Sequence, residues 1–70
     1  MLNLPWSVDL DRLVAENDDA RVDFRIREDG RIGVADLTAK RLAFVDYELA
    51  ADARRAFERH ARAEGRMPSA

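Results

Sequence analysis

The stretch RIREDGRIGV, residues 25–34, predicts a β-hairpin whose loop can be counted in two ways. If the loop is Asp29-Gly30, the two apolar residues that follow it share a face with the arginines before it. If the loop is Glu28-Asp29-Gly30, they join the apolar residues of the first strand instead. The apolar set in question is Val22, Phe24, Ile26, Ile32 and Val34. The loop count therefore decides whether the hairpin has one apolar face and a separate arginine face.

The three-residue loop is the favoured reading. It consists of a type I turn followed by one left-handed residue, a position that suits glycine, and Gly30 stands there. A one-residue slip of register would turn every side chain to the other face, so burial selects this count. The alternation of apolar and charged residues over 21–27 supports the first strand. The expected pairing sets Arg27 opposite Arg31, Ile26 opposite Ile32 and Phe24 opposite Val34.

The segment before the hairpin, PWSVDLDRLVAEND at 5–18, is predicted to be a short helix. Ser7 is a suitable N-cap, and Asn17 stands where a helix often stops. The expected buried stripe is Leu10, Leu13 and Val14, with Trp6 folded back on it.

The segment after the hairpin is predicted to be one long helix, capped by Asp36 or Thr38 and ended by Gly65. Its expected buried stripe is Leu42, Val45, Leu49, Ala53, Ala56, Phe57 and His60. Residues 41–47, RLAFVDY, would equally suit a third strand before a shorter helix. The predicted fold is a small two-layer α+β domain, with a three-stranded antiparallel sheet plus a C-terminal helix as the alternative.

Size and composition predict a single domain over residues 1–70, with residues 1–6 and 66–70 flexible or loosely packed. A chain this short buries about 60% of its unfolded surface, so its stability is marginal without reinforcement. It has no cysteine and only one histidine, which leaves neither a disulfide nor a His/Cys zinc site. Association is the remaining reinforcement, and a homodimer through the long helix is expected.

Catalysis and cofactors are not expected. The hydroxyls are few, the glycines are isolated, and His60 is explained by its place near the end of a helix. The pairs Asp9/Asp11 and Asp18/Asp19 lack the ligand spacing of a calcium loop. No apolar run approaches the roughly 20 residues that span a bilayer, and a cytoplasmic location is the default.

Charge is unevenly distributed, although the net charge is −2. Residues 1–20 carry five acids against one arginine, whereas residues 38–70 carry seven bases against five acids. Arginines form two expected clusters: Arg25, Arg27 and Arg31 on the outer face of the hairpin, and Arg55, Arg59, Arg62 and Arg66 along one face of the helix. Either cluster could bind an anionic partner, or be neutralised by nearby acids.

Two aromatic residues, Phe44 and Tyr47, fall off the predicted helix stripe and indicate either an interface or a wide core stripe. The favoured function is a non-enzymatic protein-binding module that modulates or inhibits a larger macromolecule. An inhibitor of host machinery of the kind phages and mobile elements encode fits a chain of this size. The alternative is a nucleic-acid-binding regulator that contacts phosphate through the helix arginines. The identity of the partner does not follow from the sequence.

Overall fold

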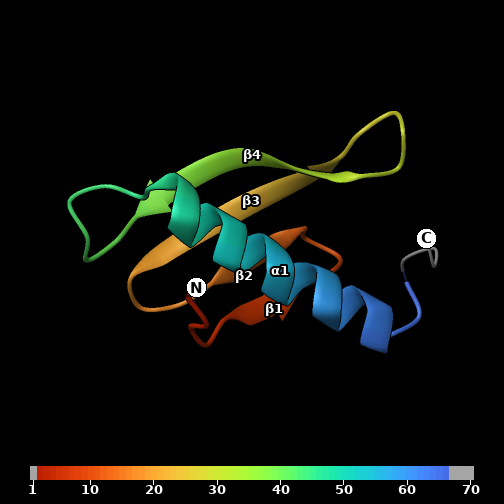
Figure 1. Ribbon diagram of the computed structural model, residues 1–70, viewed down its shortest axis with the longest axis horizontal. Helices are drawn as coiled ribbons and strands as arrows, with labels where there is room; N and C mark the ends of the chain where they lie inside the picture. The colour runs from red at the N-terminus through yellow and green to blue at the C-terminus, as the bar shows by residue number, and fades with distance from the viewer. Residues whose placement is uncertain (1, 67–70) are drawn as a thin grey trace.

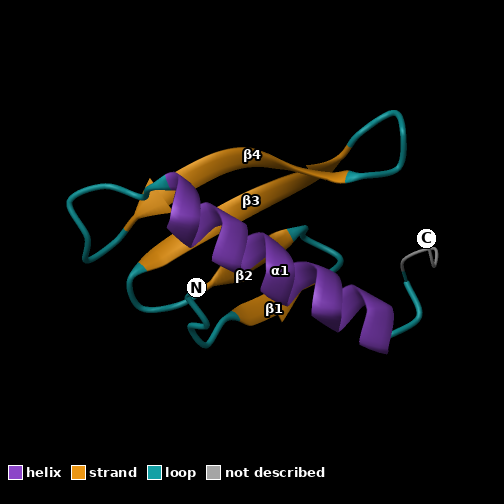
Figure 2. Ribbon diagram, in the orientation of Figure 1, coloured by secondary structure: helices purple, strands orange, loops and turns teal. Residues whose placement is uncertain are grey.

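The computed structural model describes residues 2–66 and shows a four-stranded antiparallel sheet with one helix across one face (Figures 1 and 2). The strand order follows the chain, so the sheet is a meander. The elements are β1 (Ser7–Asp9), β2 (Val14–Glu16), β3 (Ala20–Ile26), β4 (Ile32–Ala39) and α1 (Tyr47–Ala63). The α+β class and the C-terminal helix are confirmed. Residue 1 and residues 67–70, part of the ends expected to be loose, lie outside the described residues.

The β3–β4 hairpin has the three-residue loop. Phe24 pairs with Val34 and Ile26 with Ile32. The Arg27 N–H donates to the Arg31 carbonyl at 2.8 Å, which closes the hairpin around residues 28–30. Gly30 has φ +83°, the left-handed conformation that glycine adopts without strain. The predicted register is therefore confirmed.

A β-bulge at Ala35 shifts the register of the β3–β4 ladder farther from the loop. Phe24 faces Val34 but Asp23 faces Asp36, so Ala35 has no partner on β3. The extra residue restores the phase of the apolar pattern, because Leu37 then pairs with Val22. One apolar face thus continues along the whole of β4.

The predicted N-terminal helix is wrong, because residues 7–16 form the hairpin β1–β2. The Asp9 carboxylate accepts hydrogen bonds from the N–H groups of Asp11 and Arg12, which makes a turn where helix was expected. Leu13 has φ +56°, which no helix residue has. Asn17 similarly accepts from two N–H groups of the next turn and leads into β3.

The long helix is shorter than predicted. Thr38 is a strand residue paired with Arg21, not a helix cap. Residues 40–46 are a loop, so the reading of RLAFVDY as a third strand is wrong as well. The helix begins after Asp46, whose side chain accepts a hydrogen bond from the Leu49 N–H at 2.8 Å. Leu42 and Val45 therefore do not belong to the helical stripe.

The core lies between the sheet and α1. It consists of Ala15, Val22, Phe24, Ile32, Ala53 and Phe57. The rings of Phe24 and Phe57 lie 4.7 Å apart between centroids, at 40°. Alanines let the helix approach the sheet closely, and four partly buried residues pack around the core: Trp6, Val8, Leu10 and Leu13. Within residues 2–66, no helix has the length and apolar character needed to cross a membrane.

Candidate protein-binding surfaces

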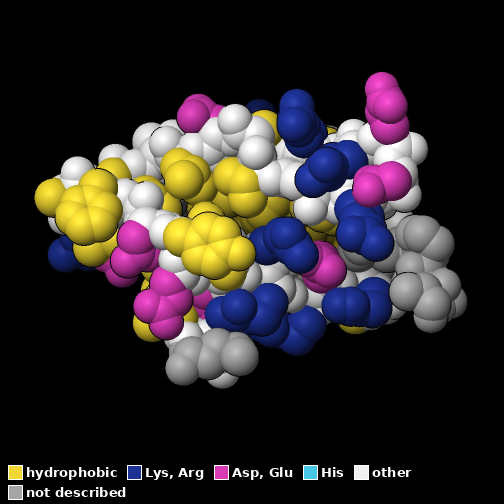
Figure 3. Space-filling view, turned by 45° about the horizontal axis from the view of Figure 1, so that its top comes forward, with side chains coloured by type: hydrophobic (Ala, Val, Ile, Leu, Met, Phe, Trp, Pro, Cys, Tyr) yellow, Lys and Arg dark blue, Asp and Glu magenta, His cyan; other side chains and the backbone are white. Residues whose placement is uncertain are grey.

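One exposed apolar surface lies where β4, the 40–46 loop and the start of α1 meet. We call it the apolar patch, and it consists of Val34, Leu37, Leu42, Phe44 and Tyr47. Phe44 is 71% exposed and Tyr47 is 88% exposed. Figure 3 shows apolar side chains gathered over one end of this side of the molecule, with lysines and arginines toward the other end.

The local structure explains this exposure. Because Asp46 caps the helix, Tyr47 is the first helical residue and lies before the buried stripe begins at Leu49. Phe44 lies in the loop, so neither α1 nor the N-terminal segment covers it. Both predicted interface aromatics are therefore exposed, and a wide core stripe does not account for them. Contiguous exposed apolar side chains on a small protein commonly mark an interaction site.

The three hairpin arginines lie near the β3–β4 loop, where β3 ends and β4 begins. Arg25 pairs with Gly33, and the stems of Arg25 and Arg27 lie against Gly33 on the face away from the helix. Arg31 approaches Asp29 at 3.9 Å, a weak exposed contact. Arg25 and Arg27 have no ion pair within the part of the chain that the structure describes.

Of the four arginines predicted along the helix, three lie on α1 and Arg66 follows its end, and most of them are engaged with acids of the same chain. Arg55 pairs with Asp52 at 3.4 Å, and Arg62 approaches Glu58 at 3.9 Å. Arg66 reaches Asp11 in the β1–β2 turn at 2.9 Å. Arg59 has no ion pair within residues 2–66. The spacing of three and four residues therefore serves mainly intramolecular pairing, as helix acids placed before bases favour.

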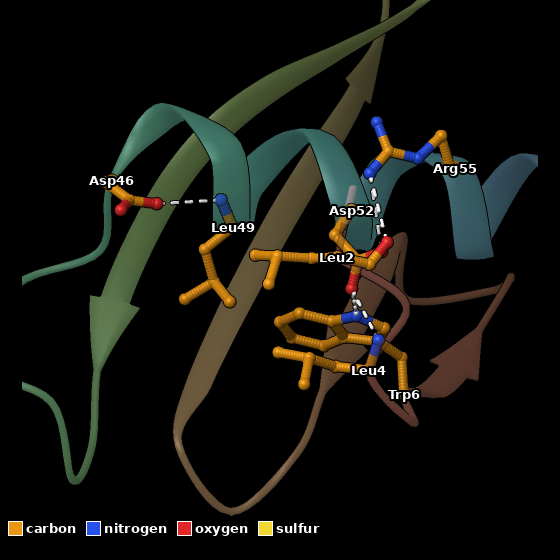
Figure 4. Close-up of polar contacts among 7 residues, drawn as sticks. All are labelled: Leu2, Leu4, Trp6, Asp46, Leu49, Asp52 and Arg55. Carbon is orange, nitrogen blue, oxygen red and sulfur yellow. Dashed lines mark hydrogen bonds and ion pairs between the residues drawn. The ribbon is translucent and has the colours of Figure 1, made fainter.

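Asp52 is the one buried charged residue among residues 2–66, and sequence reasoning did not single it out. The residue is 1% exposed, and its side chain joins α1 to the N-terminal segment (Figure 4). One carboxylate oxygen accepts from the Leu4 N–H at 2.9 Å and from the Trp6 indole N–H at 2.8 Å. The other accepts from Arg55, which also reaches the Leu2 carbonyl. The sequence did offer a signal for this role. Asp52 stands one residue before Ala53 of the predicted buried stripe, and Trp6 has an indole N–H that could donate to it.

Burial raises the pKa of Asp52, but the hydrogen bonds from Trp6 and Leu4 and the charge of Arg55 outweigh it, so the net pKa lies below its ordinary value. The pKa of Glu16 is also lowered, chiefly by its hydrogen bond from Lys40. Both carboxylates stay ionised in the folded state at pH values where the unfolded chain already takes up protons.

Because of these two carboxylates, we expect the folded protein to lose stability as the pH falls into the acid range. Their contribution is complete above the ordinary carboxyl range, about pH 4, and is lost as the pH falls through the lowered folded pKa values. Urea midpoints measured between neutral pH and pH 3 should fall more steeply for the native chain than for Asp52→Asn. Equal slopes would contradict the assigned role of Asp52.

Residues 2–66 contain no group of three or more His, Cys, Asp or Glu side chains placed to hold a metal ion. His60 is exposed near the end of α1 and lines a shallow hollow beside Trp6. An apolar groove of about 260 Å³ lies beside the C-terminal half of α1. It is lined mainly by Leu10, Leu13, Ile26, Ile32, Phe57 and Ala61.

Comparisons of this chain with protein-family models, with curated proteins and with solved structures find no match.

Proposed function

We propose that this protein is a non-enzymatic binding module that attaches to a larger protein through the apolar patch and modulates or inhibits it. The observation that carries the proposal is the exposure of Leu42, Phe44 and Tyr47, within six residues of one another along the chain, in a protein that buries few large apolar residues. Aromatic residues supply much of the energy of protein interfaces, because burying one removes a large apolar area from water.

Nucleic-acid binding through the helix arginines has less support. A phosphate-binding stripe needs arginines whose charges are free to replace counterions. Three of the four arginines lie close to acids of their own chain. The apolar patch, with both exposed aromatics, lies near the opposite end of α1. The hairpin arginines Arg25 and Arg27 have no ion pair within the described residues. The sheet face on which they lie, away from the helix, also carries acids such as Asp23 and Asp36.

The proposal is tested by capture from a lysate of the host cells, with and without nuclease, using the tagged full chain. The double variant Phe44→Ser/Tyr47→Ser should lose the captured protein while keeping its circular dichroism spectrum and urea midpoint. Substitutions at such exposed positions usually change stability by less than about 0.5 kcal/mol. The matched control Arg59→Ser/Arg62→Ser should capture the same protein as the native chain.

Two results would count against the proposal. Capture that collapses on nuclease treatment, and that the Arg59→Ser/Arg62→Ser variant loses, would favour phosphate binding. Capture that the aromatic variant retains at full yield would show that the apolar patch is not the binding surface.

A further inference from the structure

The outer edge of β4 is long and uncovered. β4 has eight residues and ends the sheet, with no strand beyond it in residues 2–66 (Figure 1). The Arg27 N–H donates to the Arg31 carbonyl, so Arg31 and then Gly33 direct their backbone groups toward β3. By the same alternation, the N–H and C=O groups of Ile32 and Val34 point away from the sheet. Such an edge is a template for another strand.

The side chains of β4 facing the helix layer are apolar and partly exposed. Val34 is 38% exposed and Leu37 is 39% exposed, and the bulge at Ala35 keeps them on one face. A strand added to this edge would cover both side chains. An apolar strand of the same pattern would therefore gain apolar contacts on this face as well as a backbone ladder.

On the face of the sheet away from the helix, β4 lies beside positive charges near Gly33 and carries a negative charge at Asp36. A Cβ on Gly33 would lie 3.2 Å from Cδ of Arg27 and 3.8 Å from Cγ of Arg25, so both arginine stems lie over this glycine. Asp36, beyond the bulge, faces Asp23, whose carboxylate is bound by Arg21. Within the described residues, Asp36 has no basic partner and the two arginines have no acidic one.

We propose that two copies of this chain associate through antiparallel pairing of β4 with β4, about a two-fold axis at Val34. Val34 then faces Val34 of the second copy, and Ile32 faces its Leu37. Asp36 of each copy faces Gly33 of the other, where it meets Arg25 and Arg27. The product is one continuous sheet, four strands from each copy, with both helices on the same face.

Charge selects this register over its neighbours. A two-fold axis at Asp36 instead of Val34 would set Asp36 against Asp36 of the second copy and Arg31 against its Lys40. An axis at Leu37 would set Lys40 against Gly33, beside Arg25 and Arg27. An axis at Gly33 would set Gly33 against Gly33 and bring the Arg25 and Arg27 pairs of the two copies together. Like charges placed opposite each other on a sheet are destabilising.

This inference goes beyond the proposed function and does not depend on it. The pairing covers Val34 and Leu37 of the apolar patch and leaves Leu42, Phe44 and Tyr47 exposed. The homodimer expected from the sequence would form through β4, not through the helix. The exposed remainder of each apolar patch, Leu42, Phe44 and Tyr47, would then be present twice in one assembly, which would allow bivalent attachment to a partner.

Analytical ultracentrifugation of the full chain over a concentration series tests the pairing. We expect a species of twice the 8.0 kDa chain mass. Asp36→Arg should raise the dimer dissociation constant by at least about tenfold, because it places like charges together. Arg25→Asp/Arg27→Asp should do the same, and the triple variant carrying all three changes should recover the dimer. Glu64→Arg, an equal charge change at the end of α1, should leave it intact.

A second variant tests the backbone ladder without altering charge. Val34→Pro removes an N–H that points away from β3, so the monomer should keep its circular dichroism spectrum while the dimer is lost. A native chain that stays monomeric at every concentration would overturn the inference. So would a dimer that Asp36→Arg leaves unchanged, or a triple variant that fails to recover it. Phe44→Ser/Tyr47→Ser should remain dimeric, so failure of capture and failure of dimerisation are separate results.

Discussion

Phe57→Ala should destabilise the fold by about 3–5 kcal/mol, the largest effect expected of any single substitution in this chain. Phe57 is 2% exposed and packs on Phe24 at the centre of the core. The residues around it include Ala15 and Ala53, which have no side chain that could move into the space. A cost of this size is a large part of the total stability of a small domain. Urea denaturation followed by circular dichroism measures it.

Ile26→Ala is the matched control, because it also shortens a large apolar side chain, here an exposed one on β3. Ile26 is 62% exposed, so the loss should be less than about 1 kcal/mol. Equal losses at the two positions would mean that α1 does not cover the sheet as described.

Asp52→Ala is expected to have the second largest effect, about 2–3 kcal/mol. The substitution leaves the Trp6 indole N–H and the Leu4 N–H without their acceptor, and it frees the segment before β1 from the helix. Asp52→Asn should recover part of the loss, since its amide oxygen can still accept one of these bonds. Thermal and urea unfolding of the three proteins give the comparison.

Glu64→Ala removes an exposed acid at the end of the same helix and should change stability by less than about 0.5 kcal/mol. If Asp52→Ala were as mild as this control, the carboxylate would not hold the N-terminal segment. Trp6→Phe, which removes one donor and keeps most of the apolar surface, should give an intermediate loss.

The central hairpin could be predicted because its signals are local. Alternation over seven residues, a glycine at the third loop position and the cost of a register slip all point to one pairing. The bulge at Ala35 was harder to foresee, since it depends on where Leu37 must lie after the loop register is set. Propensity alone does not show that Thr38 continues a strand.

The N-terminal hairpin was missed because two periodicities compete. Leu10, Leu13 and Val14 match a helix, but the apolar residues at 2, 4, 6, 8 and 10 alternate as in a strand. In the structure these alternate residues are the partly buried ones. Asp9 and Asn17 fit either reading, since both residue types cap helices and also form turns. Strands this short depend on tertiary pairing with β3, which no local pattern reports.

The start of the helix and the binding surfaces show the same limit. Asp46 caps α1 in the structure, whereas the sequence analysis named Asp36 or Thr38, and all three are residue types that cap helices. The helical spacing placed Arg66 on the same face as Arg55, Arg59 and Arg62, but α1 ends at Ala63, and Arg66 reaches its acid in a turn that the predicted N-terminal helix excluded. The free edge of β4 follows from the strand order, and the strand order required the missed hairpin.

The measurement that tests the central claim most directly is an NMR titration of the isotope-labelled chain with the purified protein that it captures. We expect the largest amide shift changes over residues 40–49, around Phe44 and Tyr47, and small changes over residues 59–66. Changes confined to 59–66, with none at Phe44 or Tyr47, would contradict the assignment of the apolar patch as the binding surface.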